Sequence, residues 1–131
     1  MSNPFGPKVL AVKDESAQQP IPTAWRPVFC EIVRAFVERD YRLESGVLGV
    51  KPVSVDAAAS IQRCIKAYGA TLVALPEETW NSSVCMWCGD HWDVLVDLWT
   101  QEEGPSDLVL STTVSEEEMG FGFKIQLVYV P

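Results

Sequence analysis

The sequence predicts an α+β protein in which two N-terminal helices pack on one face of an antiparallel sheet of about five strands in meander order. Up to residue 68, apolar residues recur every three to four positions, the period of a helix with one buried face. Beyond residue 69 the period falls to two, as in half-buried strands, and polar or glycine-containing loops separate the segments. Because the helical patterns precede the strand patterns, we expect the two kinds of element to form separate layers.

Both helices have recognisable ends. The first follows Thr23, a candidate N-cap, carries Pro27 in its first turn and is expected to end near residues 40–42. The second follows the candidate N-cap Ser54 and ends at Gly69, because glycine readily adopts the left-handed conformation that closes a helix.

The chain before the first helix has a different character. Residues 1–22 hold four of the nine prolines and show no helical period. Their longest apolar run, residues 9–12, is shorter than the ~7–15 residues of a signal-peptide core. We therefore expect an irregular segment over residues 1–22, a single domain over residues 23–131 and a cytoplasmic location.

The predicted strands share an alternating pattern. The dipeptide Gly89-Asp90 suits a two-residue hairpin turn, because glycine is favoured at the first central position. The five expected strands span residues 71–75, 83–88, 91–100, 107–115 and 121–130. In the last strand, one face is expected to carry Phe121, Phe123, Ile125, Leu127 and Tyr129.

Composition excludes several classes of protein. Hydrophobic residues make up 47% of the chain and charged residues 21%, which is incompatible with intrinsic disorder. No apolar run approaches the ~20 residues of a membrane span. The net charge of −8 disfavours nucleic acid and anionic membranes as partners, because phosphates bind cationic surfaces.

The charge is concentrated in the second half. Residues 69–131 hold one basic residue, Lys124, and 11 acidic ones, a net charge of −10, whereas residues 1–68 hold nine basic and seven acidic residues. An acidic surface of this kind has two explanations. It keeps the protein soluble, or it steers a basic partner protein towards its binding site.

The Gly89-Asp90 turn determines which side chains share a face of the sheet, because successive residues of a strand point to opposite sides. One side, here called the apolar face, is expected to meet the helices and holds Cys85, Trp87, Trp92, Val94, Val96 and Leu98. The other side, the polar face, is the candidate binding surface and holds Met86, Cys88, His91, Asp93, Leu95, Asp97 and Trp99.

The spacing Cys85-x-x-Cys88-x-x-His91 resembles a zinc motif. In an extended strand, however, residues three apart point to opposite faces, so Cys85 and Cys88 are not expected to share a metal ion. No second paired motif supplies further ligands. We therefore predict no metal and no cofactor, and four reduced thiols.

His91, the only histidine, is a candidate general base beside Asp93 and Cys88. No helix N-terminus or glycine-rich loop is expected next to these residues to form an oxyanion hole. Because the alternative is a surface histidine paired with a carboxylate, we assign no catalytic residue.

Several segments resemble a family of small bacterial proteins known only as a domain of unknown function. They are HWDVLVDLWTQEEG (residues 91–104), SDLVLS (106–111) and LVYVP (127–131), and the likeness extends back through PIP (20–22), WRP (25–27) and LPEETW (75–80). The resemblance covers about residues 20–131, implies a bacterial or phage-related source and transfers no catalytic residue. The order of elements is also loosely similar to cone-shaped NTF2-like folds, an analogy that concerns fold alone.

Three hypotheses follow. The first is a non-enzymatic acidic binding protein, in its concrete form an immunity or inhibitor protein against a basic toxin, because Trp99 lies among acidic residues on the polar face. The alternative is an NTF2-like small-ligand binder or enzyme with a pocket at His91, Asp93 and Cys88. The third is a homodimer that buries the polar face.

Overall fold

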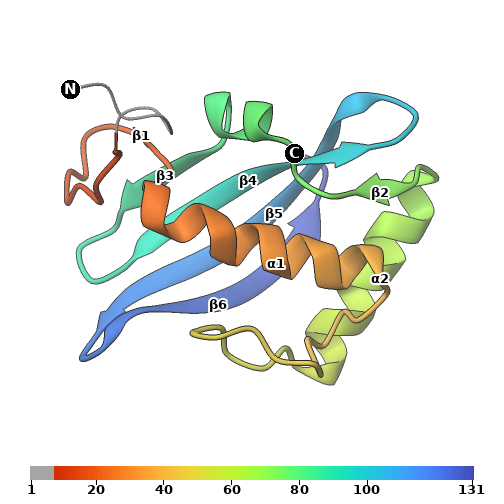
Figure 1. Ribbon diagram of the computed structural model, residues 1–131, viewed down its shortest axis with the longest axis horizontal. Helices are drawn as coiled ribbons and strands as arrows, with labels where there is room; N and C mark the ends of the chain where they lie inside the picture. The colour runs from red at the N-terminus through yellow and green to blue at the C-terminus, as the bar shows by residue number, and fades with distance from the viewer. Residues whose placement is uncertain (1–7) are drawn as a thin grey trace.

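The computed structural model describes residues 8–131 and places two α-helices on one face of a six-stranded antiparallel sheet (Figure 1). The helices are α1 (Arg26–Val37) and α2 (Val55–Tyr68), with the short 3-10 helices η1 (Thr23–Trp25) and η2 (Glu77–Asn81). The strands are β1 (Gln19–Pro20), β2 (Leu72–Val73), β3 (Val84–Trp87), β4 (Trp92–Thr100), β5 (Gly104–Glu117) and β6 (Gly120–Tyr129). The predicted α+β class with an antiparallel sheet is therefore confirmed.

The prediction is wrong in the position of the helices and in the number of strands. The strand order is β1-β3-β4-β5-β6, and β2 pairs with β4. Because β1 precedes α1 and pairs with β3, the helices lie in the middle of the chain. Two residues that include Pro20 leave no alternating pattern, and proline in a sheet is confined to edges and strand starts, so the sequence gives no signal for this strand.

The meander order holds only from β3 to β6. Residues Leu72 and Val73 pair with Thr100 and Trp99 at the end of β4, beyond the last pair of the shorter β3. Strands β2 and β3 are therefore consecutive in the sequence, but they do not pair with each other.

Helix α2 begins and ends as predicted. The Ser54 hydroxyl accepts a hydrogen bond from the Ala57 N–H at 3.1 Å, and Gly69 has φ 82° at the C-terminal end. Within residues 8–131, no helix has the length and apolarity that crossing a membrane requires.

Helix α1 differs from its prediction at both ends. Thr23 does not cap α1: its hydroxyl accepts the Val9 N–H at 2.7 Å, and its own N–H donates to the Val9 carbonyl. The helix ends at Val37, and Arg39 follows with φ 67°. Thr23 therefore anchors the N-terminal segment instead of the helix.

The hydrophobic core lies between the helices and the apolar face. Trp25 is at its centre and packs edge-to-face on Trp92, Phe121 and Phe123, with ring centroids 5.3–6.1 Å apart. Such aromatic pairs add stabilisation beyond the area they bury. This packing fixes the side of the sheet on which α1 lies.

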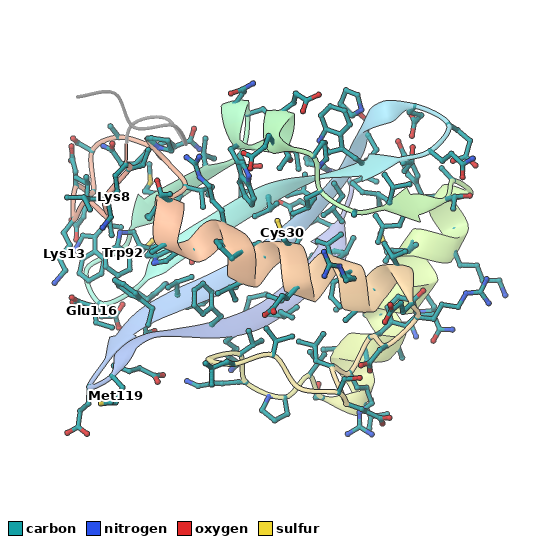
Figure 2. All side chains as sticks on the ribbon, viewed as in Figure 1. Lys8, Lys13, Cys30, Trp92, Glu116 and Met119 are labelled. Carbon is teal, nitrogen blue, oxygen red and sulfur yellow. The ribbon has the colours of Figure 1, made fainter. Side chains whose placement is uncertain are left out.

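The N-terminal segment extends the core at one end of the sheet. The indole N–H of Trp92 donates to the Val12 carbonyl at 3.0 Å, and Lys13 lies over the Trp87 ring and pairs with Glu116 (Figure 2). Residues 8–18 contain no strand, and residues 1–7 of the predicted irregular segment lie outside the described part.

Candidate functional site

The β3–β4 hairpin has the predicted register. The Cys88 N–H donates to the His91 carbonyl at 2.8 Å and so closes the two-residue turn, in which Gly89 has φ 97°. A positive φ at the first central position is the reason that glycine is favoured there. The observed pairs are Cys85 with Val94, Met86 with Asp93, and Trp87 with Trp92.

The predicted division into two faces is visible in the burial of the strands. Along β4, residues alternate strictly between buried positions and positions that are exposed or half-buried. Cys85 is 1% exposed, whereas Cys88 is exposed, so these two thiols lie on opposite sides as expected. On the polar side, Cys88 and Asp93 are exposed, and half-buried positions are held by Met86, His91, Leu95, Asp97 and Trp99.

The hairpin end of the polar face gathers the groups with the most reactive chemistry. The Cys88 thiol donates to Asp93 Oδ2 at 3.2 Å, and His91 Nε2 lies 3.2 Å from Asp93 Oδ1. The other ring nitrogen of His91, Nδ1, contacts Asp90. Desolvation, followed by the hydrogen bond and the negative charge of Asp93, raises the pKa of the Cys88 thiol. The direction of this shift is opposite to that of a thiol activated as a nucleophile, whose pKa is lowered.

Asp97 is held in place by Thr79 of η2 and by Ser83, which follows this helix. Its backbone N–H donates to Ser83 Oγ at 2.9 Å, and its carbonyl accepts the hydroxyl of Thr79. Ser83 and Thr79 are 2% and 0% exposed, so both hydroxyls are buried polar groups with partners. This network fixes the backbone of β4 midway along the polar face.

Trp99 lies at the far end of the polar face. Its ring packs against Gly104, where a Cβ atom would lie 3.6 Å from the ring. Its indole nitrogen is buried and has no hydrogen-bond partner within residues 8–131. Trp99 is therefore half-buried by the β4–β5 turn and presents only part of its ring to solvent.

The last strand reaches the polar face in a way that the sequence does not predict. Between Ser111 and Thr112 the register shifts, because Gln126 is an extra residue in β6. Phe123 and Ile125 are buried on the apolar side, whereas Leu127 is 39% exposed on the polar side. The prediction that the five alternate residues 121–129 share one face is wrong, because the bulge reverses the alternation before Leu127 and Tyr129. The continuous apolar run 127–130 conceals this change of phase in the sequence.

Further residues of the polar face come from β5 and β6, and their pattern in the sequence does not assign them to this face. Lys124 faces Thr113, which in turn pairs with Asp93, so the three residues form one row across the sheet. Leu127 and Tyr129 join them through the bulge. Only the strand order, which is a property of the whole fold, brings these residues beside β4.

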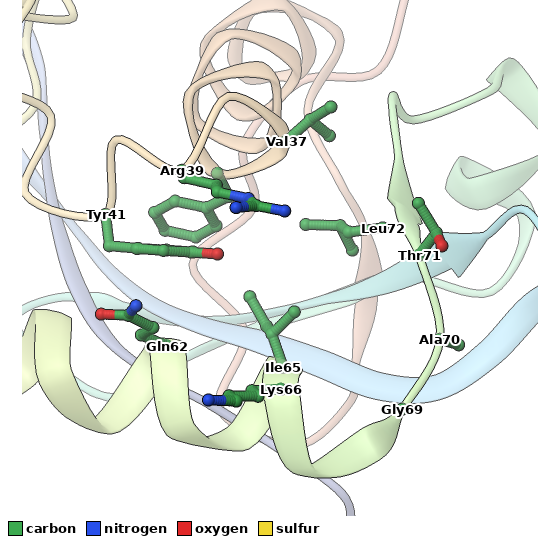
Figure 3. Close-up of a pocket in the computed structure, with 11 residues that line it drawn as sticks. Val37, Arg39, Tyr41, Gln62, Ile65, Lys66, Gly69, Ala70, Thr71 and Leu72 are labelled. Carbon is green, nitrogen blue, oxygen red and sulfur yellow. The ribbon is translucent and has the colours of Figure 1, made fainter.

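A cavity of about 510 Å³ lies on the helix side, between the end of α1, α2 and β2 (Figure 3). Ile65 and Leu72 give it an apolar wall, and Arg39 and Lys66 are its charged residues. It contains none of the seven predicted binding residues.

A second hollow, of about 300 Å³, lies on the polar face. Three of the predicted residues line it, namely Met86, Asp93 and Leu95. Of the three groups that the enzyme or ligand-binder hypothesis requires, Asp93 reaches this hollow, whereas Cys88 and His91 do not line it.

Comparison with known proteins gives a family without a described activity. No curated protein matches the chain, and no solved structure matches it. The model of a domain of unknown function, DUF7668, matches residues 33–131 and so includes the C-terminal part of α1, all of α2 and every strand except β1. The chain therefore belongs to the DUF7668 family.

Proposed function

We propose that this chain is a non-enzymatic protein that binds a basic partner protein through the polar face of its sheet. The observation that carries this proposal is the position of the helices. Both α1 and α2 lie on the other side of the sheet, so no helix of residues 8–131 covers the polar face (Figure 1).

The polar face combines apolar area with carboxylates. Leu95 and Trp99 are half-buried and Leu127 is 39% exposed, so apolar side chains reach this surface from both β4 and β6. Tryptophan is enriched among the residues that dominate binding energy, because it supplies a large rigid contact area. The partial burial of Trp99 against Gly104 holds this anchor in a fixed orientation.

The charges of the face support a basic partner. Within residues 8–131, no lysine or arginine forms a salt bridge with Asp93 or Asp97. By contrast, Glu116 and Glu117 are paired with Lys13 and Lys51. Lys13 and Lys51 thus compensate much of the acidic charge at the β5–β6 turn. On the polar face, Asp93 has only His91 as a salt-bridge partner and Asp97 has none in the described residues, which leaves Asp97 available to attract a cationic surface.

An immunity or inhibitor protein against a basic toxin or nuclease is the concrete form of this proposal. Such a protein needs an acidic surface with a rigid aromatic anchor and needs no catalytic group of its own. The raised pKa of Cys88 agrees with the absence of nucleophilic chemistry in this proposal.

Site-specific photocrosslinking tests the proposal. A photoreactive amino acid at Leu127, on the polar face, is compared with the same residue at Val37, which is 40% exposed at the end of α1. In a lysate of the source organism, we expect the probe at position 127 to capture a basic protein that the probe at position 37 does not capture. Mass spectrometry identifies the captured chain.

Two outcomes of this experiment contradict the proposal. Capture of the same protein from both positions, or from position 37 alone, places the binding surface elsewhere. Capture of a second copy of this chain from position 127 indicates the homodimer instead of a basic partner.

A further inference from the structure

The β3–β4 turn brings together three metal-binding side chains of different chemistry. One ligand atom from each of Cys88, His91 and Asp93 lies within 4.8 Å of the other two. The sulfur of Cys88 and Nε2 of His91 each lie 3.2 Å from an oxygen of Asp93. Zinc bonds of roughly 2.3 Å to sulfur and roughly 2.0 Å to nitrogen or oxygen place tetrahedral ligand atoms about 3.3–3.5 Å apart. The two 3.2 Å separations, which involve different oxygens of Asp93, are close to those of a zinc site.

The backbone holds these three residues before any ion binds. Cys88 and His91 flank the two-residue turn and are joined by the hydrogen bond from Cys88 N–H to the His91 carbonyl. Asp93 is fixed two residues further by its pairing with Met86. A site on a closed hairpin loses little chain entropy on binding, because its ligand residues are already in place.

Asp90 supplies the group that orients the histidine. Its carboxylate contacts His91 Nδ1, whereas Nε2 points to Asp93. In the neutral imidazole that a metal requires, Nδ1–H donates a hydrogen bond to Asp90, and the lone pair of Nε2 faces the cluster. Metal-binding histidines commonly have such a carboxylate partner on the other nitrogen.

The local charge also favours a cation. Asp90 and Asp93 are both negative, and neither forms a salt bridge with lysine or arginine in the described residues. The donor set of thiolate, imidazole and carboxylate discriminates among divalent ions. Magnesium and calcium take oxygen ligands, whereas sulfur and nitrogen donors together favour zinc.

We propose that Cys88, His91 and Asp93 bind one zinc ion, with Asp90 orienting His91. The three side chains leave a fourth coordination position, which solvent or a group from a bound molecule fills. This site differs from the Cys85-x-x-Cys88-x-x-His91 motif, because Cys85 is buried on the apolar side and its thiol donates to the Pro20 carbonyl at 3.6 Å. It rests on the hairpin geometry alone. It shares Asp93 with the surface proposed to bind a basic partner, so the metal titration, which uses no partner, tests this site separately.

Metal titration of the full chain tests this site. The protein is prepared without a histidine tag, reduced and stripped with a chelator. Cobalt(II) is then added as a spectroscopic probe. We expect saturation at one equivalent with a thiolate-to-cobalt charge-transfer band in the near ultraviolet, and loss of this band when zinc is added. No saturation, or saturation without the thiolate band, would overturn the proposal.

Variants identify the ligands. Cys88→Ser and His91→Ala are expected to abolish binding at one equivalent, and the matched control Cys64→Ser, which changes a half-buried thiol of α2, is expected to retain it. Far-ultraviolet circular dichroism verifies that each variant is folded. Asp90→Asn keeps all three ligands and is expected to weaken zinc binding roughly 10–100-fold. Full-affinity binding by Cys88→Ser or His91→Ala would show that the ion is held elsewhere, and unchanged affinity in Asp90→Asn would refute the orienting role of Asp90.

Discussion

The two faces of β4 are built from alternate residues of one strand, yet they have opposite environments. Trp92, Val94, Val96 and Leu98 are each at most 1% exposed under the helices. The residues between them, Asp93, Leu95, Asp97 and Trp99, are exposed or half-buried. The pleat of the strand therefore separates two roles. The buried side chains determine stability, and the exposed or half-buried side chains determine the chemistry that other molecules meet.

The largest expected effect contrasts neighbouring residues on the two faces. Trp92→Ala removes a buried ring and leaves a cavity, so we expect the free energy of unfolding to fall by about 3–5 kcal/mol. Asp93→Ala changes an exposed residue and is expected to alter it by less than about 0.5 kcal/mol. Urea denaturation measures both values. Similar losses in the two variants would show that the polar face is part of the core.

A smaller loss of stability is expected when the buried hydroxyl of Ser83, which supports β4, is removed. Ser83→Ala removes the acceptor of the Asp97 N–H and leaves a buried donor without a partner, at a cost of about 1–3 kcal/mol. Ser82→Ala is the matched control, because Ser82 is exposed and its hydroxyl makes no hydrogen bond within residues 8–131. If urea denaturation gives equal stability for the two variants, the buried network does not support β4.

The two faces of the hairpin are also expected to differ in thiol reactivity, with Cys85 on the apolar face and Cys88 on the polar face. Burial raises the pKa of Cys85 to about 11, so very little of this thiol is ionised at pH 8. Cys88 is exposed, and we expect iodoacetamide to modify it in the native protein well before Cys85. Peptide mass spectrometry after timed quenching measures the two rates. Modification of Cys85 at the rate of Cys88 would indicate that the apolar face opens readily.

The smallest expected change in stability comes from Glu102, which lies outside both faces and contacts the residue before β2. The N–H and hydroxyl of Thr71 donate to Glu102 and lower the pKa of its carboxyl below 4.5. A carboxyl with a lowered folded pKa stabilises the fold above its unfolded pKa, and this stabilisation is lost as the pH falls through the folded value. Glu102→Gln is therefore expected to be less stable than wild type at pH 7, with a difference that shrinks as the pH falls below 4.5.

The control for this pH dependence is Glu118→Gln, in the β5–β6 turn, because Glu118 is exposed and forms no salt bridge in the described residues. Chemical denaturation across the pH range compares the two variants. A difference for Glu102→Gln that stays constant down to acidic pH would contradict the role of Thr71.

The sequence was sufficient where a local signal determined the geometry. The Gly89-Asp90 turn fixed the hairpin register, and Ser54 and Gly69 marked both ends of α2. The failures arose where tertiary structure decided the outcome. Pairing with β3 made a strand of Gln19–Pro20, and Val9 engaged the hydroxyl of Thr23.

Only part of the candidate site could be predicted from the sequence. Side chains on β3 and β4 followed from alternation, whereas Leu127 and Tyr129 depended on the extra residue in β6. This bulge has no recognisable signal in the sequence, because its extra residue is Gln126 and not the glycine or proline that often marks irregular backbone. The sequence placed His91 beside Cys88 and Asp93, whereas the distances between their ligand atoms required the side-chain geometry of the turn itself.

If carboxylates of the polar face attract a basic partner, association with the protein captured through position 127 depends on these charges and on the salt concentration. Asp93→Asn/Asp97→Asn removes two charges from this face. Glu31→Gln/Glu38→Gln removes two exposed charges, one on α1 and one at its C-terminal end, with the same change in net charge. Stopped-flow or biosensor rates measured from low to high salt are predicted to show slower association and a flatter salt dependence for the first variant alone. Equal rates for the two variants at every salt concentration would contradict the account.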